Sequence, residues 1–104
     1  MSDKIVEITS NEELEDAIED NEQLLVDFYA DWCGPCKMME PTIEEISEEK
    51  DLMVAEIDID ENQHIAAQYG VRSVPTYILY EDEEAVEQMI GYQEKEDMVT
   101  KIEE

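Results

Sequence analysis

The segment at residues 24–30, LLVDFYA, limits the folds open to this chain more than any other feature. Apart from Asp27, its side chains make both faces of a strand apolar. Such a strand belongs in the middle of a sheet that other elements cover on both sides. With 104 residues, the chain is the length of one ordinary domain and can bury one core without a metal or several disulfides. We therefore predict a single α/β domain spanning residues 1–104.

Strand-like and helix-like patterns alternate along the chain. Strands are predicted from period-two or continuous apolar runs at residues 4–8, 24–30, 52–59, 76–80 and 85–91. Helices are predicted from apolar stripes at helical spacing in residues 9–20, 34–49, 61–70 and 94–104. The resulting order is βαβαβαββα, an α/β sheet with helices on both faces.

Several residues mark the ends of these elements. Ser10 and Glu13 have the spacing of a capping box, and Gly70 is suited to end the third helix. Pro41 lies inside the second helix and should kink it. The turn at 81–84, EDEE, lacks the Gly or Asn that a hairpin normally uses, so we expect it to be unusual and mobile.

The charge of the chain excludes one function class and suggests an environment. There are 31 Asp and Glu residues against six Lys and Arg, for a net charge of -25. Non-specific nucleic-acid binding needs a basic face, so we expect no nucleic-acid partner. Carboxylate repulsion destabilises a compact state, and about 1 M salt shortens the Debye length to roughly 3 Å and screens it. We therefore hypothesise a halophilic source, with a merely acidic mesophilic protein as the alternative.

The hydropathy of the chain favours the cytoplasm. No stretch reaches the ~18 consecutive apolar residues of a membrane span. The start, MSDKIVEITSNEE, lacks the basic and apolar regions of a secretory signal. We expect a cytoplasmic protein without a membrane partner.

Two residues separate the two cysteines, Cys33 and Cys36, and three interpretations compete for them. A structural zinc site needs four ligands, and the chain adds only His64, which we expect at a helix surface, so zinc would need a second chain. A structural disulfide is disfavoured in a reducing cytosol and closes too short a loop to stabilise much. A redox pair remains, and we expect no metal.

The position of the pair between a strand and a helix favours redox chemistry. At the helix start, unpaired N–H groups and the positive end of the dipole stabilise a thiolate at Cys33, and a thiolate is the attacking species in disulfide exchange. Cys36 lies one turn later and faces inward, which makes Cys33 the nucleophile and Cys36 the resolving thiol. Gly34 permits the tight entry to the helix, and Pro35 is tolerated in its first turn.

The motif WCGPC resembles the active site of thioredoxins, and the similarity covers nearly the whole chain. LVDFYADWCGPCKMMEPTIEEI resembles the second strand and second helix of that family, and VAEIDIDENQHIAAQYGVRSVPTYILY resembles its third through fourth strands. The resemblance implies the thioredoxin fold, with a central mixed β-sheet, and protein-disulfide reduction by dithiol–disulfide exchange. An oxidising or isomerising enzyme of the same fold is one alternative. A binding module with dispensable cysteines is another.

The resemblance also assigns residues outside the pair. It implies that Pro75 is a cis-proline facing the cysteines and that the backbone of Val74 pairs with an extended substrate segment. It implies an apolar substrate lip, which consists of Trp32, Ile59, Val74, Gly91 and Tyr92. Gly34 and Pro35 complete the expected substrate-binding residues.

Asp27 is the carboxylate that the central strand should bury. Burial without a partner raises a carboxyl pKa, which makes Asp27 a candidate general base for Cys36. The resemblance implies the same role, and a locally paired structural Asp is the alternative. Many thioredoxins have a lysine beside this aspartate, whereas the matching residue here is Glu56. A second carboxylate should raise the pKa of Asp27 further and couple the two titrations.

The resemblance finally implies partners. Disulfide-containing proteins are the expected substrates, and a flavin-containing thioredoxin reductase is expected to re-reduce the pair. The chain has no glycine-rich dinucleotide motif, so we expect it to bind no cofactor itself. We expect a monomer.

Overall fold

The computed structural model describes residues 2–104 and has the predicted order βαβαβαββα. The strands are β1 (Ile5–Glu7), β2 (Gln23–Tyr29), β3 (Met53–Asp58), β4 (Thr76–Glu81) and β5 (Glu84–Ile90). The helices are α1 (Asn11–Asp20), α2 (Gly34–Glu49), α3 (Gln63–Gln68) and α4 (Lys95–Glu103). Helix α2 has the predicted bounds and runs through Pro41. The other elements differ from the prediction by one or two residues at an end, where hydrogen bonding rather than side-chain pattern sets the boundary.

Strand β2 lies at the centre of the sheet, as its sequence predicts. The strand order is β1-β3-β2-β4-β5. Strands β1, β3 and β2 are parallel to one another, β4 is antiparallel to β2, and β5 is antiparallel to β4. Leu24, Leu25, Val26 and Phe28 have no exposed surface. A strand with both faces buried must be covered on both sides, so the mixed sheet with flanking helices confirms the expected fold class.

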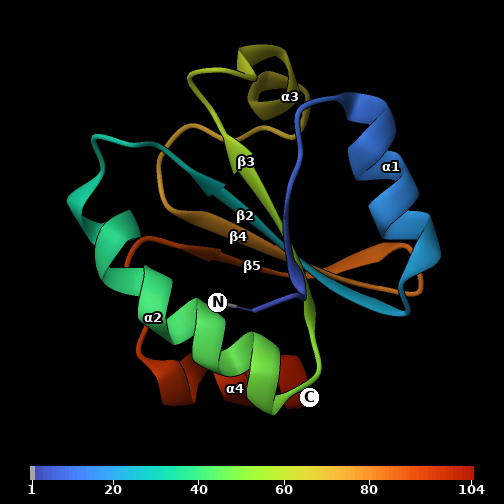
Figure 1. The fold of residues 1–104 in the computed structure, drawn as a ribbon, viewed down its shortest axis with the longest axis vertical. Helices are drawn as coiled ribbons and strands as arrows, with labels where there is room; N and C mark the ends of the chain where they lie inside the picture. The colour runs from blue at the N-terminus through green and yellow to red at the C-terminus, as the bar shows by residue number, and fades with distance from the viewer. Residues whose placement is uncertain (1) are drawn as a thin grey trace.

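The sheet divides the core into two layers, and helices cover each of them. Helices α2 and α4 lie on one face of the sheet, and α1 and α3 lie on the other (Figure 1). The first layer packs Met39, Ile43, Ile46, Met98 and Ile102 of the helices against Leu25, Val54, Tyr77, Leu79 and Met89 of the sheet. Alternate residues of a strand point to opposite faces, so Asp27 lies on the same face as Leu25, the face that α2 covers.

The capping box predicted for α1 forms only in part. Ser10 is the N-cap, and its hydroxyl accepts a hydrogen bond from the Glu13 N–H at 3.1 Å. The Glu13 carboxylate bonds mainly Thr9, accepting from the Thr9 N–H at 2.8 Å and from its hydroxyl at 2.9 Å, and Ser10 makes a smaller contribution. Thr9 offers two donors to one carboxylate oxygen, whereas the Ser10 backbone offers one. Gly70 follows the C-cap of α3 with φ +72°, as predicted.

The turn between β4 and β5 has a backbone that the sequence alone does not suggest. Asp82 and Glu83 both have positive φ, 51° and 70°. Positive φ at both central residues characterises the type I′ hairpin turn, which normally uses Gly or Asn because a Cβ is strained there. The expectation of an unusual turn is confirmed, and its mobility stays a prediction.

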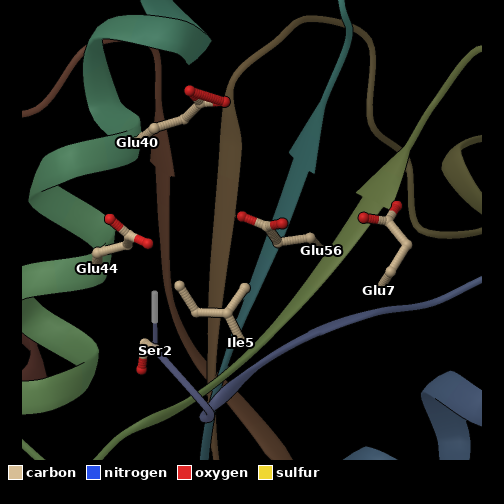
Figure 2. Close-up of a pocket in the computed structure, with 6 residues that line it drawn as sticks. All are labelled: Ser2, Ile5, Glu7, Glu40, Glu44 and Glu56. Atoms are coloured by element: carbon tan, nitrogen blue, oxygen red, sulfur yellow. The ribbon is translucent and has the colours of Figure 1, made fainter.

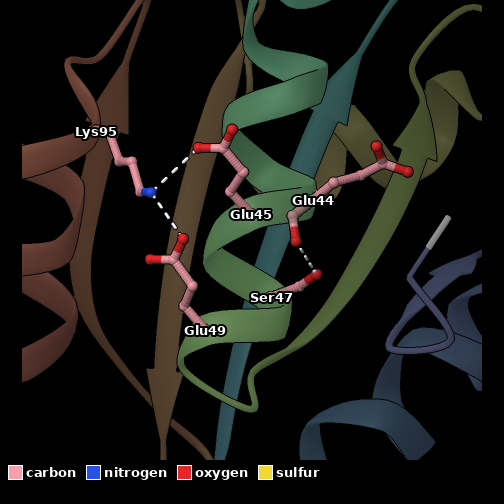
Figure 3. Close-up of polar contacts among 5 residues, drawn as sticks. All are labelled: Glu44, Glu45, Ser47, Glu49 and Lys95. Carbon is pink, nitrogen blue, oxygen red and sulfur yellow. Dashed lines mark hydrogen bonds and ion pairs between the residues drawn. The ribbon is translucent and has the colours of Figure 1, made fainter.

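Ion pairs neutralise few of the carboxylates. Among residues 2–104, the ion pairs are Lys4–Asp51, Lys50–Glu103, Lys95 with Glu45 and Glu49, and Lys101–Glu87. Figure 3 shows Lys95 of α4 between Glu45 and Glu49 of α2, at 3.1 and 2.9 Å. Exposed pairs of this kind stabilise a protein by about 0–1 kcal/mol each, so most of the negative charge is not offset. Across the same residues, no helix has the length and apolar character needed to cross a membrane.

Candidate active site

Cys33 and Cys36 form a disulfide at the start of α2, with their Cα atoms 5.2 Å apart. Cys33 is the N-cap of the helix, and its Sγ accepts a hydrogen bond from the Cys36 N–H at 3.1 Å. Pro35 occupies the first turn, where its missing N–H would have no intrahelical partner. Because the helix start directs N–H groups and a positive partial charge toward Cys33, it stabilises a thiolate there after reduction.

The cysteine pair lies under an apolar surface. Cys33 and Cys36 are 3% and 7% exposed and pack with Ala30. Ile59 and Val74 of the expected substrate lip pack against this cluster. Trp32, next to Cys33, is 69% exposed. The reactive edge therefore combines covered sulfur atoms with apolar side chains open to a partner.

A second group of lip residues is connected to the first through Pro75. The Val74–Pro75 peptide bond is cis. The Pro75 carbonyl accepts a hydrogen bond from the Gly91 N–H at 2.8 Å, and Gly91 has φ +85°. Tyr92, which follows, is 48% exposed. The structure therefore links the segment of Val74 and Pro75 to that of Gly91 and Tyr92. Gly34 and Pro35 are exposed beside the cysteines.

Asp27 lies behind the pair, on the α2 face of the sheet. It is 6% exposed, and within residues 2–104 its Oδ1 has no hydrogen-bond partner. It lines a cavity of about 190 Å³ together with Cys36, Glu40 and Glu56, which we call the inner cavity. Burial raises the pKa of Asp27 well above its usual range, and the carboxylates of Glu56, Glu7 and Glu40 raise it further. A buried carboxyl group that shares a cavity with a thiol can exchange a proton with it.

Asp27 is one of three carboxylates in a row across the sheet. The strand register places it beside Glu56, and Glu56 beside Glu7. Figure 2 shows Glu7 and Glu56 with Glu40 and Glu44 of α2 around a second space, the outer cavity of about 430 Å³. Burial, together with the negative charges of Glu7, Glu40 and Glu44, raises the pKa of Glu56 to about 7. The second carboxylate expected beside Asp27 is thus part of a larger cluster.

Two residues of this region escape sequence reasoning. The Trp32 Nε1–H donates a hydrogen bond to Asp60 Oδ2 at 2.8 Å, which holds the exposed indole. Asp60 follows β3, and the ends of neighbouring parallel strands meet at one edge of a sheet, which was the available signal. Glu40 lies four residues after Cys36, on the same face of α2, and that spacing could have placed it near the thiol.

The structure offers no ready metal centre in its described part. His64 is exposed on α3, as predicted. Across residues 2–104, no three or more His, Cys, Asp or Glu side chains are grouped so that they could hold a metal ion.

Comparison with known proteins gives consistent matches. The sequence model of the family described as Thioredoxin matches residues 5–104. The thioredoxin of Alicyclobacillus acidocaldarius is 43% identical over 88 residues, which cover 83% of this chain and 84% of that protein. The thioredoxin of Bacillus subtilis is 48% identical over 75 residues, which cover 70% of this chain and 72% of that protein.

A solved structure extends these matches to the fold. The N21Q mutant thioredoxin from Halobacterium salinarum superimposes with a TM-score of 0.92 and 46% identity, covering 99% of this chain and 92% of that one. The family match includes the cysteine pair and runs from β1 to the end of the chain. On this basis the chain belongs to the thioredoxin family and reduces protein disulfides by dithiol–disulfide exchange.

Proposed function

We propose that Cys33 is the nucleophile and Cys36 the resolving thiol of this exchange. The Cys33 thiolate attacks one sulfur of a substrate disulfide; a Cys33–substrate bond forms, and the other substrate sulfur leaves as a thiolate. The Cys36 thiolate then attacks Cys33 Sγ, forming the Cys33–Cys36 bond and releasing the second substrate thiolate. Two electrons pass to the substrate, and the protein pair becomes oxidised.

One observation carries this assignment. Cys33 is the helix N-cap, and its sulfur accepts the Cys36 N–H at 3.1 Å. That hydrogen bond and the helix dipole favour negative charge on Cys33 over Cys36. The order of the two attacks follows from this difference.

Asp27 is the proposed proton acceptor for Cys36. Both residues line the inner cavity, and the unpartnered Oδ1 of Asp27 leaves one acceptor oxygen available. A base in that position converts the resolving thiol into the thiolate that the second attack requires.

The substrate lip and its neighbours receive the substrate chain. Trp32 and Tyr92 offer exposed aromatic surface, and Val74 offers backbone groups for pairing with an extended segment. Pro75 holds this segment beside the pair, and Gly34 and Pro35 present the helix start to the partner.

The setting of the reaction is also a proposal. The net charge of -25 and the likeness to a protein from Halobacterium salinarum support a cytoplasm of high salt. The protein works there as a monomeric single domain without a cofactor of its own. It binds no nucleic acid or membrane, and a flavoprotein thioredoxin reductase regenerates it.

The test is reduction of a synthetic peptide closed by one disulfide, with dithiothreitol as reductant, in dilute and molar KCl. We expect the wild type to accelerate reduction, most strongly in molar KCl. The double change Cys33→Ser and Cys36→Ser should abolish the acceleration, and the exposed control His64→Ser should retain it. Equal rates with the double variant and the wild type would contradict the proposal.

A further inference from the structure

Asp27 cannot complete the proposed reaction alone, because a proton taken from Cys36 must leave again. Asp27 is 6% exposed, so it has little contact with bulk water. A substrate bound over Trp32 and Val74 further covers the cysteine side of the site. The proton therefore needs an exit on the opposite side of Asp27.

The two cavities provide such an exit. The inner cavity touches Cys36 and Asp27, and the outer cavity is lined by residues of β1, β3 and α2. Glu56 and Glu40 line both cavities, whereas no residue of the substrate lip lines either. A path through the two cavities consequently stays open while the lip is occupied.

Glu56 is better placed on this path than Glu40. The β2–β3 register pairs Glu56 directly with Asp27, at the roughly 5 Å spacing of neighbouring strands. Figure 2 shows the Glu56 carboxylate directed into the outer cavity. The inner cavity is large and polar enough to hold water, so a proton can pass from Asp27 to Glu56 directly or through one water molecule.

The surrounding charges determine which carboxyl group keeps a proton. The titratable and charged groups around Asp27 and Glu56 come from several elements. They are Glu7 on β1, Tyr29 on β2, Tyr77 on β4, Lys37, Glu40 and Glu44 on α2, and Asp31, which also lines the inner cavity. Two neighbouring carboxylates do not both ionise readily, and the more buried one keeps the proton. That residue is Asp27. Burial also raises the pKa of Tyr29 and Tyr77 above its usual range, so neither phenol can act as a base near neutral pH.

We propose that Glu56 is a proton-relay residue: Asp27 takes the Cys36 proton while giving its own proton to Glu56, which releases it through the outer cavity. The balance is one thiol converted into a thiolate and one carboxylate converted into a carboxylic acid, with Asp27 unchanged. The relay rests on the proposed roles of Cys36 and Asp27. Glu56 acts through Asp27, so it is a positioning residue and not a catalytic one.

The test measures the resolving step by stopped flow. Reduced protein is mixed with saturating disulfide peptide, so that the unimolecular step limits the rate, and the fluorescence of Trp32, the single tryptophan, reports it. The pH runs from about 5 to 9, across the pKa of Glu56, which burial and the neighbouring carboxylates raise to about 7. Wild-type rates should rise with pH around that value.

Glu56→Gln should lower the plateau rate about ten-fold or more and remove the rise near pH 7. Glu56→Asp, which keeps a carboxylate, should restore the rise. Glu44→Gln is the matched control, since it removes one charge from the outer cavity only. Glu44→Gln should leave the plateau rate of the resolving step unchanged and shift the midpoint of its pH profile to lower pH.

A different result for Glu56→Gln would overturn the proposed relay. If Glu56 only repels charge, Glu56→Gln lowers the pKa of Asp27 and the rate at pH 7 increases, which overturns the relay. Thermal melts check that each variant folds, and Glu56→Met, of similar volume, serves if Glu56→Gln does not. Wild-type protein without a resolving step would refute the proposed function itself, whatever Glu56 does.

Discussion

Replacing Glu56 by glutamine should stabilise the folded protein, and by more at high pH than at low pH. The folded-state pKa of Glu56 is about 7 against an ordinary 4.5, and those of Asp27 and Glu7 are also raised. Between these values the folded protein binds more protons than the unfolded chain, so wild-type stability falls as pH rises from about 4.5 through 7. Glu56→Gln removes one of these groups and lowers the pKa of Asp27.

The size of the effect follows from the register. Asp27 and Glu56 are direct neighbours on parallel strands, and the backbones of neighbouring strands lie about 5 Å apart. We take this spacing as the separation of the two charges. At the high end of the pH range, where Asp27 also ionises, two such charges repel by about 3 kcal/mol at an effective dielectric constant of about 20. Glu56 is partly exposed, and solvent screening reduces the gain to about 1–3 kcal/mol. Below the ordinary Glu pKa of 4.5, the folded and unfolded chains both hold the Glu56 proton, and the substitution should be close to neutral.

Urea unfolding of the disulfide form at constant ionic strength measures this difference. The disulfide keeps the cysteines from titrating, and urea adds no charge that would screen the cluster. Glu19→Gln, at an exposed position on α1, is the control and should change stability by less than about 0.5 kcal/mol at every pH. A stability gain for Glu56→Gln that is equal at pH 5 and pH 9 would refute the reasoning.

Three further predictions concern the turn, the surface and the lip. Glu83→Gly should stabilise the protein by about 1 kcal/mol and raise the melting temperature by about 4–8 °C, because φ 70° suits glycine; an unchanged melt would show no strain at Glu83. Urea stability should increase from dilute to molar KCl because screening weakens carboxylate repulsion, and indifference to KCl would exclude the halophilic proposal. Trp32→Phe removes the 2.8 Å hydrogen bond to Asp60 and should raise the KM for a disulfide peptide a few-fold with kcat unchanged. A fall in kcat alone would instead assign Trp32 to the chemical step.

The fold could be predicted where one local pattern decides the structure. The central position of β2 follows from a strand that is apolar on both faces, and the bounds of α2 follow from Gly34, Pro35 and a regular apolar stripe. In the predicted capping box, the Glu13 carboxylate bonds mainly Thr9, because neighbouring residues compete for it and sequence does not rank them. The positive φ values of Asp82 and Glu83 could not be predicted, because two acidic residues give no sequence signal for that backbone conformation.

The candidate site divides in the same way. The cysteine pair and its place at a helix start could be inferred from the sequence, as could the burial of Asp27. The position of Glu7 beside Glu56 could not be inferred from the sequence. It depends on how β1 aligns with β3, and no local pattern sets that register. The hydrogen bond from Trp32 to Asp60 likewise joins two loops that only the tertiary fold brings together.

Trapping the mixed disulfide tests the assignment of the two cysteines most directly. Each reduced single variant, Cys36→Ser and Cys33→Ser, is incubated with a disulfide peptide, and intact-protein mass spectrometry measures the adduct. Cys36→Ser keeps the proposed nucleophile at the helix start and loses the proposed resolving thiol, so it should accumulate one peptide per protein chain. Cys33→Ser retains only Cys36, whose sulfur is not at the helix N-cap and has no such stabilisation of its thiolate, so it should accumulate almost none. An adduct that forms faster on Cys33→Ser than on Cys36→Ser would contradict the account.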